Sequence, residues 1–223
     1  MYRIAPQTSR TLELLPALTQ PAPRMPARAG LAEGLDRELI RKAIHLLVAL
    51  VPPLASVNLP VTMGLLMAGT LFYTAAEAMR LAGIRVAVVS GLTVAAARPG
   101  DTGFVLGPVT LGLGAMLALL LYPLPASAIA IYALAFGNSA ASVIGMAFAG
   151  RRLPLNRNKT VAGSAACFAA VFLVTITLTA DLRLSIAVAA AAMTVEALSG
   201  RDLDNLLIPV GVGMVVQAVR ALP

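Results

Sequence analysis

Residues 161–180 read VAGSAACFAAVFLVTITLTA, a run without a single charged side chain. The hydrocarbon core of a bilayer is about 30 Å thick, and roughly 20 apolar residues in an α-helix cross it. This stretch therefore predicts a membrane-spanning helix. The whole chain suits that solvent, because 59% of its 223 residues are hydrophobic and only 12% are charged, which is too little polar sequence to cover a water-soluble globule.

Apolar runs of similar length recur along the chain between short polar breaks. They predict an all-α fold, a polytopic transmembrane helical bundle of about seven spans. The predicted spans are 39–58, 60–79, 103–122, 125–149, 161–180, 183–199 and 205–220. The stretch 81–98 is apolar but interrupted by Arg85, a pattern that suits an interfacial or re-entrant helix better than a span.

The first 36 residues differ from the rest of the chain in composition. They hold five prolines and four arginines and no long apolar core, so they do not resemble a secretory signal peptide. The composition predicts that residues 1–36 form a disordered cytoplasmic tail, with a targeting segment as the alternative. Residues 37–223 are expected to form one transmembrane domain.

Basic residues are distributed unevenly between the two sides that seven spans would create. The N-terminal tail and the loops around 80–102, 150–160 and 200–204 share one side and carry all the lysines and arginines except Arg183 and Arg220. Cytoplasmic loops of membrane proteins are enriched in these residues. We therefore expect an integral protein of the cytoplasmic (inner) membrane, with a cytoplasmic N-terminus and the C-terminus outside.

Several classes of function are disfavoured by composition. The net charge of +7 would suit nucleic acid, but the basic residues are scattered through loops and the chain contains no tryptophan, so no stacking surface accompanies the charge. One cysteine, Cys167, cannot form an internal disulfide, and one histidine, His45, cannot form a two-histidine zinc motif.

Polar and ionisable residues inside the predicted spans are costly, and each is a candidate functional residue. The candidates are Arg41, His45, Glu77, Arg80, Asn138, Glu196, Asp204 and Asn205. Nearly all fall in the cytoplasmic half of their spans, so we expect them to meet in one polar pocket. Two alternatives stay open: an interfacial Arg41 could extend to the headgroups, and Glu77 with Arg80 could be a local ion pair that orders a helix end.

The fourth predicted span contains GNSAASVIGMAFAG (137–150), in which small residues recur at three- and four-residue intervals. This spacing is typical of a helix-packing face. Asn138 is the exception, because an amide at that depth needs a partner from another helix or from a ligand.

The loop RRLPLNRNKT (151–160) leads directly into the next span. Its last residue is a predicted N-cap, and the free N–H groups of residues 161–164 would form an anion-binding helix start. An ordinary positively charged loop is the alternative. The residues expected to contact an anion are Arg157, Lys159, Thr160, Gly163 and Ser164.

Glu196 and the run RDLDNLLIPV (201–210) bring carboxylates to the same predicted face. Carboxylates beside a phosphate-binding loop would repel the ligand unless a divalent cation lay between them. Mg²⁺ is that cation in most nucleotide sites, so Glu196 and Asp204 are the predicted metal ligands.

Five segments together resemble the CTP-dependent polyprenol kinase family, whose members include dolichol kinase, phytol kinase and the yeast-type diacylglycerol kinase. This family is grouped with the phosphatidate cytidylyltransferases. The resemblance runs in order from about residue 38 to residue 220. The segments are RKAIH (41–45), GNSAASVIG (137–145), LPLNRNKTVAGS (153–164), EAL (196–198) and LDNLLIPV (203–210).

The resemblance implies a transmembrane catalytic domain that transfers the γ-phosphate of CTP, or of a related nucleoside triphosphate, to the hydroxyl of a long-chain isoprenoid or lipid alcohol. It implies a site on the cytoplasmic face of the bilayer, with Mg²⁺ and without nucleic acid. Arg41, Lys42 and His45 match the motif of the family's first helix. The implied catalytic residues are Lys159, Glu196, Asp204 and His45. The implied nucleotide-binding residues are Arg157, Thr160, Gly163, Ser164, Asn138 and Asn205.

One position departs from the family pattern. The family usually has Gly-Asp where this chain has Gly137-Asn138, and asparagine keeps the shape of aspartate but loses its charge. Two alternatives to a kinase therefore stay open. One is CDP-lipid synthesis like that of phosphatidate cytidylyltransferase, although the long signature of that enzyme is not found. The other is an inactive relative or a lipid-phosphate carrier.

Overall fold

A computed structural model of the chain describes residues 27–84, 86, 89, 91, 93, 103–148, 150–200 and 202–221, with side chains from residue 34 onward. The regular elements within these residues are helices, and an isolated antiparallel bridge joins Arg152 to Thr160. The predicted all-α fold is confirmed for this part of the chain.

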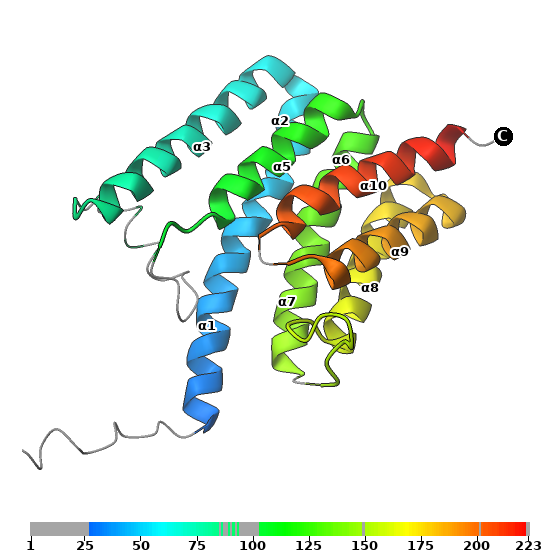
Figure 1. Cartoon of the computed structure of the whole chain (residues 1–223). Helices are drawn as coiled ribbons and strands as arrows, with labels where there is room; N and C mark the ends of the chain where they lie inside the picture. Colours follow the sequence, from blue (N-terminus) through cyan, green and yellow to red (C-terminus); the bar gives the residue numbers. More distant parts are fainter. Residues whose placement is uncertain are drawn as a thin grey trace, which may run out of the picture. The chain divides into compact units, whose positions relative to one another are not determined.

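Figure 1 shows the helices in chain order. Their bounds are α1 (Ala27–Leu46), η2 (Leu47–Leu50), α2 (Val51–Val57), α3 (Leu59–Leu81), α5 (Gly107–Leu121), α6 (Ala126–Tyr132), η3 (Ala133–Gly137), α7 (Asn138–Ala147), α8 (Val161–Thr179), α9 (Leu182–Leu198) and α10 (Asp204–Ala221). Of the two short elements, η2 is a 3₁₀ turn and η3 a π-helical turn. Each apolar run predicted from the sequence coincides with a helix or with a continuous series of helices.

Four helical segments within the described residues are long and apolar enough to cross a membrane. They are Gly34–Val57, Leu59–Leu81, Ala126–Ala147 and Val161–Thr179. The shorter α5 is also apolar. A membrane protein with several spans is therefore supported by helix length and composition.

The start of α1 differs from the sequence prediction. The helix begins at Ala27, inside the range 1–36 that is predicted to be disordered. No proline interrupts the sequence between Pro26 and Pro52. Residues 1–26 and most of the 81–98 stretch lie outside the described residues, so those two predictions have no structural counterpart.

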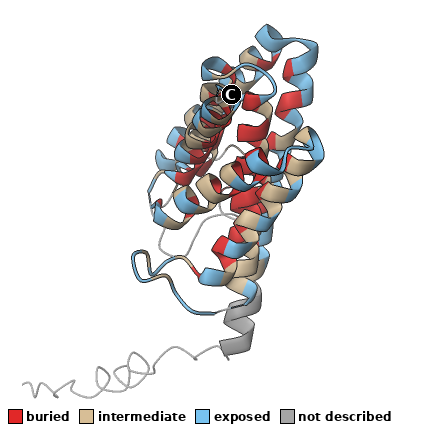
Figure 2. Ribbon diagram, turned by 90° about the vertical axis from the view of Figure 1, so that its right-hand side faces the viewer, coloured by how far each residue is buried: buried red, intermediate tan, exposed pale blue. Residues whose placement is uncertain are grey.

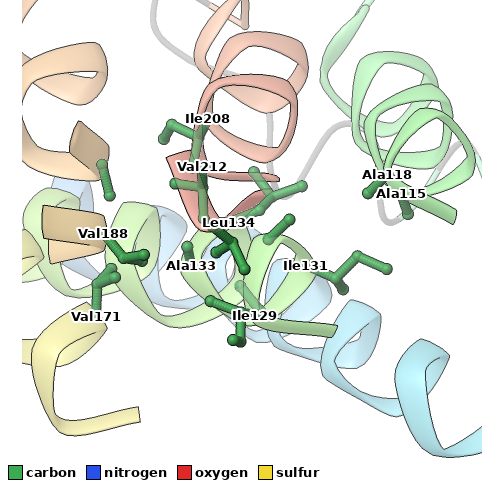
Figure 3. Packing of buried hydrophobic residues seen from close by; sticks show 14 of the residues in the cluster. Ala115, Ala118, Ile129, Ile131, Ala133, Leu134, Val171, Val188, Ile208 and Val212 are labelled. Atoms are coloured by element: carbon green, nitrogen blue, oxygen red, sulfur yellow. The ribbon is translucent and has the colours of Figure 1, made fainter. Parts of the chain in front are cut away.

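The compact unit Gly34–Pro223 has an apolar core built by successive helices. Neighbours in sequence pack together from α7 to α10, and α5 packs against both α10 and α3. Figure 3 shows Leu134 of η3, Val188 of α9 and Val212 of α10 among the buried side chains of this core. Alanines are among the fully buried residues, as at Ala118 and Ala192, and small side chains of this kind let helices approach closely.

The small-residue stripe of α7 packs against α8, as its spacing predicts. A Cβ atom on Gly163 would lie 2.6 Å from the carbonyl oxygen of Ala141, and one on Gly145 would lie 2.8 Å from Oγ1 of Thr160. Neither position has room for a side chain. By contrast, α3 buries only Thr62, Ala76 and Glu77, and buried residues concentrate on the inward faces of the other helices (Figure 2). The exposed apolar surface of α3 suits contact with lipid.

Candidate functional site

A cavity of about 250 Å³ collects most of the polar residues that the sequence singled out. Seven of the residues named from the sequence line it: Arg41, Lys42, His45, Asn138, Lys159, Asp204 and Asn205. They come from α1, α7, α10 and the loop before α8. The remaining wall is largely apolar and includes Leu47, Pro108 and Leu111. The lining of the cavity is therefore amphipathic, because it contains charged and amide groups as well as aliphatic side chains.

Lys159 lies between the two carboxylates that were predicted as metal ligands. Its Nζ atom donates to Oε1 of Glu196 at 2.8 Å and to Oδ2 of Asp204 at 3.3 Å. Both acids are largely buried, with 3% of Glu196 and 8% of Asp204 exposed. The ammonium of Lys159 thus occupies the place between the acids, where the sequence argument put a divalent cation.

The charge of this lysine follows from its surroundings. Burial alone would lower the pKa of Lys159, but the carboxylates of Asp204 and Glu196 outweigh that effect and raise the pKa above its ordinary value. Lys159 is therefore a cation throughout the physiological pH range.

Asn156 fixes the loop that carries Lys159. Its side-chain Nδ2 donates to the carbonyl oxygens of Ala197 at 3.2 Å and Ser199 at 3.0 Å, which are carbonyls at the C-terminal end of α9 that the helix leaves unpaired. The turn is closed further by the backbone N–H of Lys159, which donates to the carbonyl oxygen of Asn156 at 3.0 Å. The sequence argument missed this residue because an asparagine in a loop gives no signal of its partner.

The start of α8 differs from the predicted anion site. Thr160 is the N-cap, as expected, and its Oγ1 accepts from the N–H of Gly163 at 3.0 Å. The N–H of Val161 donates to the carbonyl oxygen of Arg151, and that of Ser164 to the carbonyl oxygen of Thr160. Three of the four N–H groups expected to bind an anion are therefore used by the protein itself, and the prediction of an open anion-binding helix start is wrong.

The other residues predicted to bind an anion also differ from that prediction. Arg157 is exposed at the surface of the turn and does not line the cavity. Gly163 gives room to α7 rather than to a ligand. The hydroxyl of Ser164 donates to Oε2 of Glu196 at 3.2 Å, so Ser164 orients the carboxylate that binds Lys159.

Asn205 joins four helices through one amide group and is only 1% exposed. Its Oδ1 faces Nε2 of His45 at 3.0 Å and accepts from Nδ2 of Asn138 at 3.2 Å. Its Nδ2 donates to the carbonyl oxygen of Gly107 at 3.3 Å and to Oγ1 of Thr110 at 2.9 Å. All four hydrogen-bonding positions of the amide are used, so Asn205 holds its neighbours in place.

His45 is confined by acceptors on both sides of its ring. Nε2 lies 3.0 Å from Oδ1 of Asn205, and Nδ1 lies 3.3 Å from the carbonyl oxygen of Arg41. Neither nitrogen is left for a substrate proton, which weakens the prediction that His45 acts as a base.

Glu38 belongs to the site although the sequence argument did not include it. It is 5% exposed, forms an ion pair with Arg41 and accepts a hydrogen bond from the hydroxyl of Ser142. The predicted span began at residue 39, and that boundary excluded Glu38. Its spacing of three residues from Arg41 on one helix was the available signal.

Glu77 and Arg80 form a separate cluster. Arg80 donates to both carboxylate oxygens of Glu77, at 2.8 and 2.7 Å, and to the carbonyl oxygen of Gly103 at 3.0 Å. Glu77 also accepts from the backbone N–H of Val105 at 3.0 Å. The alternative reading of a local ion pair is therefore the better one, and the pair attaches the segment before α5 to α3.

The acidic residues of the site can be compared with the ligands that a metal ion requires. Within the described part of the chain, no group of three or more His, Cys, Asp or Glu side chains gathers around one point. Glu196 and Asp204 converge on Lys159, and two carboxylates suit a Mg²⁺ ion that takes its other ligands from phosphate and water.

No protein-family model, curated protein or solved structure matches this chain. The motifs and the geometry of the cavity are therefore the basis for inferring a function.

Proposed function

We propose that this chain is a membrane lipid kinase of the CTP-dependent polyprenol kinase type, which transfers the γ-phosphate of CTP or a related nucleoside triphosphate to a long-chain isoprenoid or other lipid alcohol. One observation carries the proposal. The cavity is lined by cations, carboxylates and amides together with aliphatic side chains, a mixture that suits a polar headgroup joined to an apolar chain.

The proposed topology has seven spans, with the N-terminus in the cytoplasm and the site on the cytoplasmic face of the inner membrane. It is supported by the asymmetry of basic residues. It is also supported by the contact between Asn156 and the end of α9, because two loops assigned to the same side are expected to meet at one end of the bundle.

In the proposed reaction, the hydroxyl oxygen of the lipid alcohol attacks the γ-phosphorus of CTP, the bond to the β-phosphate oxygen breaks, and CDP leaves. Asp204 is the best candidate to accept the hydroxyl proton, because it lines the cavity whereas both nitrogens of His45 face protein oxygens. Lys159 and Arg41 would neutralise phosphate charge, which is the main requirement of phosphoryl transfer.

Magnesium is the proposed cofactor. Glu196 and Asp204 would hold it, and it would neutralise charge on the β- and γ-phosphates when bound. Since both acids bind Lys159 in this structure, the proposal requires Lys159 to exchange at least one carboxylate for a phosphate oxygen.

The decisive experiment is an assay of the full chain in detergent micelles with CTP labelled at either the α- or the γ-phosphate. The acceptor panel is phytol, farnesol, polyprenol, diacylglycerol and phosphatidate. A kinase moves only the γ label into lipid, and we expect Asp204→Asn to abolish most of that transfer while Asp181→Asn, at the N-cap of α9, does not. Transfer of the α label would replace the kinase by a cytidylyltransferase.

A second candidate is a lipid-phosphate binding or carrier protein without turnover. It is favoured by Asn138, which donates to Asn205 at 3.2 Å at a position where the family has an aspartate. Absence of both label transfers across the panel, with gain of γ transfer in Asn138→Asp, would favour this candidate.

A further inference from the structure

Lys42 is a buried cation that lines the cavity. It lies on α1, one residue after Arg41, and only 4% of it is exposed. Lysine is rarely buried to this extent unless its ammonium is paired. We therefore examined which groups surround the ammonium of Lys42.

The other cationic groups that line the cavity have partners within the protein. Arg41 pairs with Glu38, and Lys159 pairs with Glu196 and Asp204. Lys42 differs: within the described residues, no carboxylate oxygen lies within 4.0 Å of its Nζ atom and no hydrogen bond to that atom is present.

The charged groups around Lys42 do not supply the counter-ion that its ammonium lacks. Glu38 and Asp204 attract the ammonium from beyond pairing distance, whereas Arg41 and Lys159 repel it. Both acids are already bound to those two cations. A buried ammonium without a counter-ion is unfavourable, so an anion supplied by a ligand is what would complete the site.

We propose that Lys42 is the principal anion-binding residue of the cavity and that it binds a phosphate group of the ligand. The start of α8 is closed to an anion by its own hydrogen bonds, and Lys159 is held by two carboxylates. Among the cations that line the cavity, Lys42 is the one for which the described part of the chain supplies no ion-pair or hydrogen-bond partner. The identity of the ligand as a nucleotide rests on the proposed function, but the phosphate site itself does not.

The test measures binding of inorganic pyrophosphate to the full chain in detergent micelles, and of phosphatidate in lipid nanodiscs, in the absence of any acceptor alcohol. We expect Lys42→Met to weaken pyrophosphate binding at least tenfold and Lys42→Arg to weaken it less. Arg152→Met, which removes an exposed cation from the loop before α8, should leave binding unchanged. Loss of phosphatidate binding alone would identify the lipid as the source of the phosphate.

A stability measurement separates this role from a structural one. Lys42→Met removes an unpaired buried charge, so its melting temperature without ligand should equal or exceed that of the unaltered protein. In the unaltered protein, pyrophosphate should also protect Lys42 from acetylation by acetic anhydride, which mass spectrometry detects without any substitution. Unchanged binding of both probes in Lys42→Met, or acetylation of Lys42 that pyrophosphate does not slow, would overturn the proposal.

The two proposals fail in different ways. If Lys42→Met loses pyrophosphate binding while the unaltered protein transfers neither CTP label, the phosphate site stands and the kinase does not. If Lys42→Met transfers the γ label as fast as the unaltered protein, the kinase stands and the role of Lys42 does not.

Discussion

Glu77 on α3 and Glu196 on α9 are both buried carboxylates that bind a cation of the protein, but their surroundings differ. Glu77 is saturated, since it accepts two hydrogen bonds from Arg80 and one from the backbone of Val105. Glu196 shares Lys159 with Asp204, and both Lys159 and Asp204 line the cavity. We call the first cluster closed, because its carboxylate is bound only by protein groups. We call the second open, because two of its members line the cavity, where a ligand could reach them.

This difference separates a structural ion pair from a candidate site. A closed cluster contributes to stability, because both oxygens of its buried carboxylate already have protein partners. An open cluster can exchange a protein partner for a ligand atom. Substitutions in the closed cluster should therefore change the free energy of unfolding. Substitutions in the open cluster should change turnover or ligand binding.

The largest expected effect is on the stability of the closed cluster. Arg80→Met leaves the carboxylate of Glu77, which is 0% exposed, without its counter-ion, and should lower the free energy of unfolding by about 3 kcal/mol. Denaturation in detergent micelles measures this. Arg183→Met removes an exposed arginine at the start of α9 and should change stability by less than about 0.5 kcal/mol. Equal effects of the two substitutions would contradict the distinction between the clusters.

The next effect is on turnover at the open cluster. Lys159→Ala removes the cation that holds Glu196 and Asp204, and γ-phosphate transfer should fall about 100-fold while the protein stays folded by size-exclusion chromatography. Asn158→Ala, an exposed neighbour in the same turn, should retain its activity. Full activity of Lys159→Ala would remove this loop from the mechanism.

A smaller effect on turnover is expected from substitution of Glu196, which binds Lys159. Glu196→Gln keeps the shape of the side chain and its acceptor oxygen but loses the charge. Magnesium-dependent transfer should fall about tenfold, and more magnesium should be needed for half-maximal rate. A rate and magnesium dependence equal to those of the unaltered protein would exclude Glu196 from metal binding.

The sequence predicted the helices well because their signal is local. Uncharged runs such as 161–180 need no knowledge of the rest of the chain to be recognised as helices in an apolar solvent. The N-cap at Thr160 was predictable for the same reason. The convergence of Asn138, Lys159 and Asp204 on one cavity was predictable because all three lie toward the same predicted side of the bundle.

The sequence could not predict which polar atoms are already paired. The contact of Asn156 with the end of α9 spans more than forty residues, and nothing local distinguishes a loop asparagine with such a partner from one without. The same limit applies to the start of α8, whose N–H groups are taken by Thr160 and Arg151. The isolation of Lys42 depends on the places of Glu38 and Asp204, which only the fold sets.

The amide of Asn205 has a mechanical consequence. Its oxygen is shared by His45 of α1 and Asn138 of α7, and its nitrogen by two groups of α5. If α7 shifts to accommodate a guest molecule, the shared oxygen must move or change partners, and the histidine on α1 then responds. A displacement of any one of these helices would therefore disturb hydrogen bonds that anchor the other three.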